Sequence, residues 1–174
     1  MSESIDQQIY NAAVSKGFTP TAAKLVVAQA RHETGNYTSN IFKLNNNLFG
    51  MKYVKQPLAT QGSASPRSEG DFYARYKSVG DSVKDLIDRN YILTRGGVTP
   101  EKLKNATDSL DFATKLKARG YYGDTISNYA NGLKSALNRI NIVEFVQKNK
   151  GKLLILGLGL VLVSVSYYLY NKKQ

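Results

Sequence analysis

The chain has 174 residues, which suits one domain of ordinary size with an appendage, and its 24 basic and 13 acidic side chains give a formal charge of +11. It contains no cysteine, which excludes a disulfide framework and a thiolate metal site. A basic surface favours polyanions, so nucleic acid, anionic lipid and the acidic bacterial cell wall all remain open as partners.

The chain begins with two predicted helices. Helical spacing of apolar residues predicts the first over residues 4–16. Thr19 as the cap and Pro20 in the first turn predict the start of the second helix, and Gly35 predicts its end. Glu33 is therefore expected in the final turn of this second helix.

Between residues 36 and 70 the helical pattern gives way to Asn, Ser, Gly and Pro with isolated apolar residues. We expect a tight loop at residues 45–50 and a mobile tip at residues 57–66. Two short strands, residues 51–54 and 72–76, are predicted to pair across that tip as a hairpin.

Helical spacing returns after residue 78. It predicts helices over residues 79–91, 99–105, 110–118 and 126–140. The predicted fold class is therefore mainly α, with one small β-hairpin or irregular lobe inserted after the second helix.

The C-terminal segment has the features of a membrane anchor. From Leu153 to Tyr170 it holds no charged residue, and as a helix it would span roughly 27 Å, close to the roughly 30 Å hydrocarbon core of a bilayer. Lysines flank both ends, and tyrosines gather at one of them. We expect a domain of residues 1–141, with a charge of +7, and a transmembrane helix within residues 142–174. The alternative is a buried helix of the core.

The start of the chain lacks the basic stretch and the unbroken apolar run of a signal peptide. We therefore expect no cleaved secretory signal. This leaves the C-terminal segment as the predicted means of reaching a membrane.

Glu33 is the candidate general acid. Cleavage of a glycosidic bond needs an acid that is still protonated near neutral pH to donate to the leaving oxygen. The C-terminus of a helix and apolar neighbours that remove water both favour the protonated form of a carboxyl group, and we expect such a buried setting here. The alternative is an ordinary residue at a helix end. His32 adjoins it but points about 100° away around the helix, so we assign it no direct chemistry.

Several segments, taken in chain order, resemble the glucosaminidase family of bacterial and phage peptidoglycan hydrolases, whose fold is lysozyme-like. They are AQARHETG (28–35), NNLFGMK (46–52), YARYKS (73–78), SVKDLI (82–87) and FATKLKARGYYGDTISNY (112–129). The resemblance covers roughly residues 20–140, and the order of the motifs is more specific than any one of them. It implies a lysozyme-like (α+β) catalytic domain.

The resemblance also implies roles for individual residues. Glu33 corresponds to the catalytic general acid of the family. Tyr121 lies in GYYGD, where the family has a Gly-Tyr-Ala-Thr-Asp string, and corresponds to an active-site tyrosine; Asp124 of the same string is interpreted as structural. The predicted substrate-binding residues, which include the family's N-x-F-G motif, are Asn47, Phe49, Gly50 and Tyr122.

The chain departs from the family pattern at the hairpin, where family members often carry a second carboxylate soon after a threonine. The equivalent place, near Thr60 and Gln61, has no acid. Glu69 is the nearest carboxylate and is our candidate second catalytic residue, with Asp71 behind it. With a single acid, the substrate's own N-acetyl group could attack, or an anhydro sugar could be released, as in a lytic transglycosylase.

The leading prediction is a peptidoglycan hydrolase that cleaves β-1,4 glycosidic bonds, either N-acetylglucosaminyl or N-acetylmuramyl. Its architecture favours a phage virion lytic enzyme anchored in a virion internal membrane or a host membrane, with peptidoglycan, lipid and other virion proteins as partners. The alternatives are a non-catalytic wall-binding or structural virion protein and, from the +7 charge alone, a nucleic-acid-binding protein. No cofactor or metal is expected, because no His and acid cluster has metal-ligand spacing.

Overall fold

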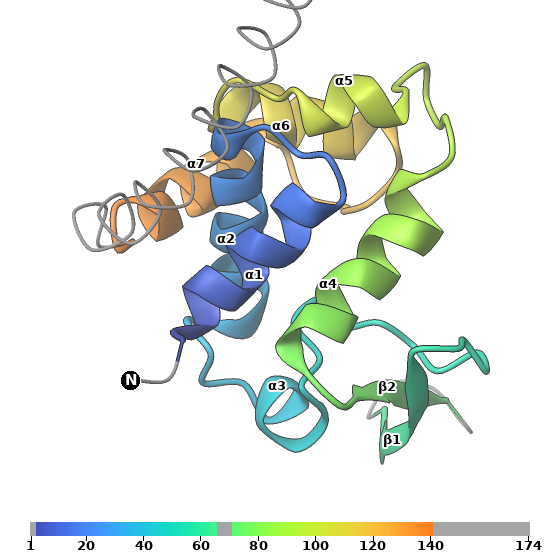
Figure 1. Ribbon diagram of the computed structural model, residues 1–174. Coiled ribbons are helices and arrows are strands. Elements are labelled where there is room, and N and C mark those ends of the chain that lie inside the picture. The colour runs from blue at the N-terminus through green and yellow to red at the C-terminus, as the bar shows by residue number, and fades with distance from the viewer. Residues whose placement is uncertain (1–2, 66–70, 141–174) are drawn as a thin grey trace, which may run out of the picture. The chain divides into compact units, whose positions relative to one another are not determined.

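The computed structural model describes residues 3–65 and 71–140 (Figure 1). The described elements, in chain order, are α1 (Ile5–Ser15), α2 (Pro20–Thr34), α3 (Asn40–Asn45), β1 (Ala59–Ala64), β2 (Phe72–Tyr76), α4 (Val79–Leu86), the π-helical turn η1 (Ile87–Tyr91), α5 (Pro100–Lys104), α6 (Ser109–Ala118) and α7 (Ile126–Leu137). The mainly helical class with a small β lobe is confirmed.

Helix α2 is the centre of the helical part. It packs against both α1 and α7, and α7 packs in turn against α6. Its side chains from Ala22 to Ala30 are buried almost without interruption, and most of them are alanine or valine. A helix that is apolar all round must be enclosed by neighbours, and small side chains let those neighbours approach closely. Burial ends in the last turn, where His32 and Glu33 are exposed.

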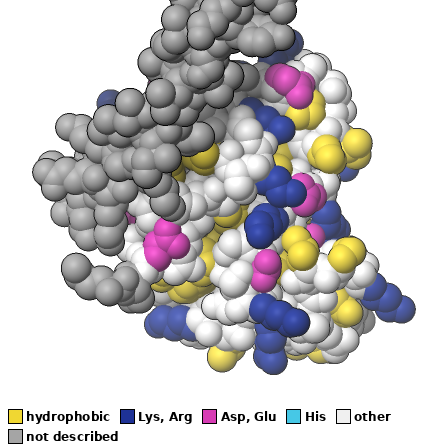
Figure 2. Space-filling model, in the orientation of Figure 1, with side chains coloured by type: hydrophobic (Ala, Val, Ile, Leu, Met, Phe, Trp, Pro, Cys, Tyr) yellow, Lys and Arg dark blue, Asp and Glu magenta, His cyan; other side chains and the backbone are white. Residues whose placement is uncertain are grey.

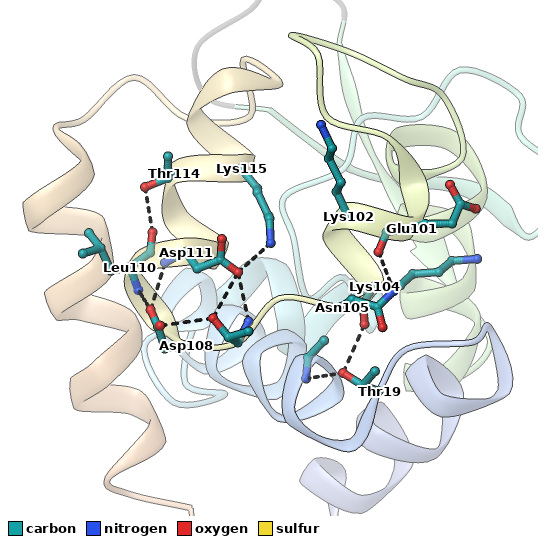
Figure 3. Close-up of polar contacts among 12 residues, drawn as sticks. Thr19, Glu101, Lys102, Lys104, Asn105, Asp108, Leu110, Asp111, Thr114 and Lys115 are labelled. Atoms are coloured by element: carbon teal, nitrogen blue, oxygen red, sulfur yellow. Dashed lines mark hydrogen bonds and ion pairs between the residues drawn. The ribbon is translucent and has the colours of Figure 1, made fainter.

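Helix starts are specified locally by side chains that accept hydrogen bonds from free backbone N–H groups. Thr19 caps α2 through Ala22 and also donates its hydroxyl to the Lys104 carbonyl at 3.2 Å, which ties α2 to the end of α5 (Figure 3). Asp108 caps α6, where its side chain accepts hydrogen bonds from the backbone N–H groups of Asp111 and Leu110. These bonds, chiefly the one from Asp111, lower the pKa of Asp108. The predicted cap and proline start at Thr19 is confirmed.

The predicted hairpin exists, but the prediction of its first strand was wrong. The partner of β2 is β1, which lies inside the segment expected to be a mobile tip, and residues 51–54 contribute a single bridge between Lys52 and Tyr73. The two strands are antiparallel and carry a register shift between Gln61 and Ala64. Polar, glycine-containing β1 has no alternating apolar pattern, so sequence periodicity did not reveal it.

Residues 36–70 were also expected to lack helix, yet they contain α3. Ser39 caps this short helix, and its last residue, Asn45, is fully buried against the hairpin. The Asn45 side chain accepts from the Ser63 backbone N–H at 3.0 Å and donates to the Ser63 hydroxyl at 2.8 Å. A Cβ at the neighbouring Gly62 would come within 2.3 Å of the Asn45 side-chain oxygen. The irregular point of the hairpin is therefore the place where α3 docks.

Helix α4 leads from the hairpin towards α5, as Figure 1 shows, and is pinned to the lobe by one buried carboxylate. Asp85 accepts from the Tyr76 hydroxyl at 2.6 Å and from the Gln56 side chain at 3.4 Å, and it faces Arg89 at 3.6 Å. Burial, and then the bond to Asp85, raise the pKa of Tyr76. This buried network fixes the lobe relative to the helices that follow it.

No helix among residues 3–65 and 71–140 is long and apolar enough to cross a membrane. The predicted anchor, residues 142–174, lies outside the described residues.

On the described surface that Figure 2 shows, Lys and Arg side chains lie among Asp and Glu side chains.

A tight turn between η1 and α5 lies very close to the backbone at the end of α6. Residues Arg95 and Val98 pair through both backbone N–H groups, and Gly96 and Gly97 between them both have positive φ. A Cβ on Gly96 would lie 1.8 Å from the Ala118 carbonyl oxygen, whereas one on Gly97 meets nothing within 4 Å. The turn is thus pressed onto the end of α6 at Gly96.

We expect Gly96→Ala to lower the free energy of unfolding by about 3 kcal/mol or more, because it adds a backbone clash to the positive-φ strain. The matched control, Gly97→Ala, has the strain alone and should cost about 1 kcal/mol. Urea unfolding measures both values. Equal losses would show that the close approach to Ala118 does not exist.

Candidate active site

Glu33 lies at the point where α2 leaves the core. Gly35 ends the helix in the left-handed conformation at φ 56, and its N–H and that of Asn36 bond to carbonyls of the last turn. On the same turn, Arg31 pairs with Asp6 of α1 at 2.6 Å, and both side chains are mostly buried. Tyr37 donates to the same carboxylate at 2.6 Å. The backbone that carries Glu33 is therefore fixed.

The Glu33 carboxylate is bound by one tyrosine from a distant part of the chain. The Tyr129 hydroxyl of α7 donates to Glu33 Oε1 at 2.7 Å, and Tyr129 is 4% exposed. No described residue bonds to Glu33 Oε2 or forms an ion pair with this carboxylate. The expectation of a buried acid was wrong in one respect, since the residue as a whole is exposed. One oxygen is held, and the other has no hydrogen-bond partner among the described residues.

Tyr129 is held by aromatic neighbours on both sides. Its ring stacks on Tyr122 with centroids 3.9 Å apart and planes 9° apart, and the His32 ring meets it edge-on at 5.1 Å. His32 also covers Gly132, where a Cβ would come within 2.4 Å of the imidazole. His32 thus packs α2 onto α7.

Three phenols whose pKa is affected by the charge of Glu33 stay neutral. Burial, followed by the negative charge of Glu33, raises the pKa of Tyr129. The pKa of Tyr91 and of Tyr121 is raised chiefly by burial, and the charge of Glu33 contributes to both shifts. A phenol with a raised pKa remains a hydrogen-bond donor at neutral and mildly alkaline pH. The one described donor to Glu33, the Tyr129 hydroxyl, therefore carries no charge.

Gln29 links this cluster to the core. It lies one turn before Glu33 on α2, is fully buried, and accepts from the Tyr91 hydroxyl at 2.8 Å. The Tyr91 ring lies 6.4 Å from that of Tyr121. Gln29 and Tyr91 therefore support Tyr121 from beneath.

A pocket of about 200 Å³ opens beside Tyr121. Its walls come from four separate parts of the chain, namely the loop after α3, η1, the turn before α5 and the loop after α6. They are formed by Met51, Asn90, Tyr91, Arg95, Arg119 and Tyr121, with Gly120 completing the lining. Because Tyr91 of the pocket wall donates to Gln29, one turn before Glu33 on α2, the pocket and the carboxylate belong to one region.

The predicted N-x-F-G loop is built around the side chain of Asn47. Its amide donates to the carbonyls of Met51 and Ala74 at 2.8 and 3.0 Å, and its oxygen accepts from the backbone N–H groups of Phe49 and Met51. Asn47 is 1% exposed. Its geometry suits a residue that shapes the loop and places Met51 in the pocket wall.

The remaining predicted site residues lie in different settings. Phe49 is buried, and Gly50 takes a positive φ of 63, so both shape the same loop. The Tyr122 hydroxyl donates to the Ala113 carbonyl at 2.9 Å, which leaves its ring as a support for Tyr129. Asp124 accepts from the Thr125 N–H and the Asn128 side chain, a structural role at the start of α7. Glu69 lies outside the described residues.

Sequence reasoning did not identify Gln29, Tyr91, Arg95 or Arg119 as part of this region. Gln29 precedes Glu33 by four residues, and Arg119 precedes the GYYGD string directly, so adjacency to known motifs was the available signal. No such signal marked Tyr91 or Arg95.

Among the described residues no group of His, Cys, Asp and Glu is arranged to hold a metal ion.

Chemically, the arrangement can offer one carboxyl group with a free oxygen, neutral phenolic donors and an adjoining pocket with two cationic side chains. These are the parts needed for proton donation to a leaving oxygen.

Comparison with known families assigns the chain. Residues 10–142 match the model of a family described as Glucosaminidase, mannosyl-glycoprotein endo-beta-N-acetylglucosaminidase. This range contains Glu33, the loop around Asn47 and the GYYGD string. No curated protein matches the chain significantly.

Solved structures give a consistent picture. The chain is similar to a peptidoglycan hydrolase mutant from Sphingomonas sp. A1, with 27% identity, a TM-score of 0.57, and coverage of 81% of this chain and 93% of that one. The peptidoglycan hydrolase from the same organism is similar at 26% identity and a TM-score of 0.52, with 81% of this chain and 88% of that chain covered.

A chain of a type VI secretion system effector-immunity complex from Pseudomonas protegens is similar at 18% identity. Its TM-score is 0.55, with 75% of this chain and 84% of that chain covered. At this identity the likeness concerns the fold alone.

The bond between Tyr129 and Glu33 leads to a prediction. Tyr129→Phe keeps the stacked ring and removes the hydroxyl, so we expect turnover to fall about tenfold or more with little change in the thermal unfolding midpoint. Tyr122→Phe removes a hydroxyl from the other ring of the stack, one that bonds only to the Ala113 carbonyl. It should lower turnover by no more than about twofold. Equal effects in the two variants would contradict this geometry.

Proposed function

This chain belongs to the glucosaminidase family of glycoside hydrolases, and we propose that it cleaves a β-1,4 glycosidic bond in the glycan strands of bacterial peptidoglycan. The observation that carries the proposal is the Glu33 carboxylate, held through one oxygen by buried Tyr129 beside the pocket at Tyr121. The similarity to peptidoglycan hydrolases of known structure supports the choice of substrate.

In the proposed reaction Glu33 is the general acid. Its Oε1 is fixed by Tyr129, so Oε2 is the oxygen that carries the proton to the leaving glycosidic oxygen. In this proposal Tyr121, which lines the pocket and stays neutral, holds the sugar beside the breaking bond. Asn47, Phe49 and Gly50 shape the opposite loop, and Tyr122 supports Tyr129.

After Glu33 has donated its proton and the glycosidic bond has broken, several chemical routes can complete the reaction. Among the described residues of the hairpin, 59–65 and 71–76, the one acid is Asp71, which is exposed. Glu69 remains the predicted second carboxylate. Without it, the substrate's N-acetyl oxygen could displace the leaving sugar, after which water opens the ring that has formed, or the sugar could close on itself and be released as an anhydro sugar. Glu33 would be the one catalytic acid on either route.

We also propose that the protein is a phage virion enzyme, anchored by its C-terminal segment in a virion internal membrane or a host membrane. The support is the uncharged stretch from Leu153 to Tyr170 with lysines on both sides. An enzyme anchored in this way would act on the wall next to the membrane, during penetration of the host or during lysis.

The catalytic proposal is tested with Glu33→Gln. We expect clearing of purified cell walls to fall by about a thousandfold, because the amide cannot donate the required proton, while the unfolding midpoint stays unchanged. Glu101→Gln, at an exposed position on α5, is the matched control and should keep full activity. Retained activity in Glu33→Gln would refute the assignment of the acid.

Mass spectrometry of the fragments released by the wild type would identify the bond that is cut and the new reducing end or anhydro sugar. Binding to insoluble wall without any release of fragments would favour the alternative, a non-catalytic wall-binding or structural protein.

The anchor is tested by flotation of the full chain with liposomes. We expect the wild type to float with the lipid, and a Leu158→Lys, Leu162→Lys double variant to remain at the bottom, because charges at the centre of an apolar helix cost about 3 kcal/mol each. Wall-clearing activity of both proteins in detergent is the control. Equal flotation of the two would contradict membrane insertion of this segment.

A further inference from the structure

The pocket beside Tyr121 has a cationic character that proton donation by Glu33 does not use. Arg95 and Arg119 both line it, and no Asp or Glu is among the described residues of its walls. The arrangement therefore presents two positive charges to whatever occupies about 200 Å³ of space.

Arg119 is a buried cation without a carboxylate partner among the described residues. It is 7% exposed, and its guanidinium donates to the carbonyl of Val98 at 2.8 Å and to the carbonyl of Asn90. Two of the five guanidinium donors are thereby used, which leaves others for a ligand. Burial, together with the neighbouring charge of Arg95, lowers the pKa of Arg119, as expected where a counter-charge is missing.

Arg95 is presented by a rigid turn. Its backbone pairs with Val98, the intervening Gly96 is pressed onto the Ala118 carbonyl, and Arg119 binds the Val98 carbonyl from below. The Arg95 side chain is exposed and forms no hydrogen bond or ion pair with a described residue. The turn thus holds a free cationic side chain over the buried one.

The location ties this cationic pocket to the reaction. Tyr91 and Tyr121 both form part of its wall, and the Tyr91 hydroxyl donates at 2.8 Å to Gln29, which lies one turn before Glu33 on α2. A sugar held at Tyr121 would therefore carry its substituents into the pocket. In the proposed substrate, the anionic substituents closest to the sugar rings are carboxylates, either of the muramyl lactyl group or of the stem peptide.

We propose that Arg95 and Arg119 form a subsite that binds a carboxylate of the glycan substrate and so selects muramyl-containing strands over neutral ones. Planar guanidinium groups match carboxylates through paired hydrogen bonds, and a partly buried pair of this kind is stronger than an exposed one. The inference rests on the proposed function, because the ligand is taken to be that substrate.

The test uses the full chain carrying Glu33→Gln, so that binding is measured without turnover. Three tetrasaccharide probes are titrated by calorimetry at low salt. They are a neutral N-acetylglucosamine oligomer, a glycan fragment with free lactyl carboxylates, and the same fragment with stem peptides attached. Adding Arg95→Gln should weaken binding of a carboxylate probe about tenfold and change binding of the neutral probe by less than about twofold.

The two carboxylate sources give different results. Loss on the fragment with free lactyl groups assigns the subsite to the lactyl carboxylate, and loss confined to the peptide-bearing fragment assigns it to the stem peptide. Arg95→Lys should keep part of the affinity, because it keeps the charge but not the planar donor pair. Lys134→Gln, an equal change of charge at an exposed position on α7, should leave all three affinities unchanged.

Equal weakening on all three probes, no weakening on any, or no measurable binding of either carboxylate probe would overturn the inference. Failure of the proposed function gives a separate signature. In that case wild-type protein releases no fragments from cell wall, while binding of carboxylate probes still depends on Arg95. If the wild type cuts wall and its preference does not depend on Arg95, only the subsite is refuted.

Discussion

The hydrogen bond from Tyr129 to Glu33 joins residues 96 positions apart, and the candidate site depends on it. It places one carboxylate oxygen against the buried face of α7 and leaves the other free. Its geometry is set on the α2 side by Gly35 and the pairing of Arg31 with Asp6, and on the α7 side by the stack on Tyr122. Small changes in the packing of α2 against α7 would therefore move the proposed proton donor.

The choice of tyrosines around Glu33 has a physical consequence. A lysine or arginine in contact with the carboxylate would stabilise its charged form strongly, whereas phenols offer hydrogen bonds without a full positive charge. Tyr91 and Tyr129, which are buried, and Tyr121, which is partly buried, keep their protons because loss of water and the negative charge of Glu33 raise the pKa of each phenol. Arg95 and Arg119 carry full positive charges and line the adjoining pocket, where we propose that they bind a carboxylate of the substrate.

The pocket also shows how loops acquire a rigid shape here. Asn47 closes one loop with four hydrogen bonds, Gly96 allows another to touch the end of α6, and Arg119 ties that turn to η1 through backbone carbonyls. Hydrogen bonds and close backbone contacts restrict these loops, and such restriction favours the alignment of a bound sugar with one carboxyl group.

The sequence by itself determined the helices other than α3, and the position of Glu33 at the end of α2. Helix caps and ends such as Thr19, Pro20 and Gly35 act within a few residues, so local chemistry was enough to locate α2 and its last turn. The order of motifs was also enough to indicate the family. Strand β1 and helix α3 were missed because their stability comes from contacts with each other, through Asn45 and Gly62, and not from an apolar period.

Only the tertiary structure decided what surrounds Glu33. Tyr129 as its partner, Gln29 and Tyr91 as the support of Tyr121, and the pairing of Arg95 with Arg119 all join segments that are far apart in the chain. Such contacts arise from the way helices and loops pack in three dimensions, and no spacing rule along the chain encodes them. Local sequence thus gave the acid its place on a helix, while packing supplied its neighbours and the charge of the pocket beside it.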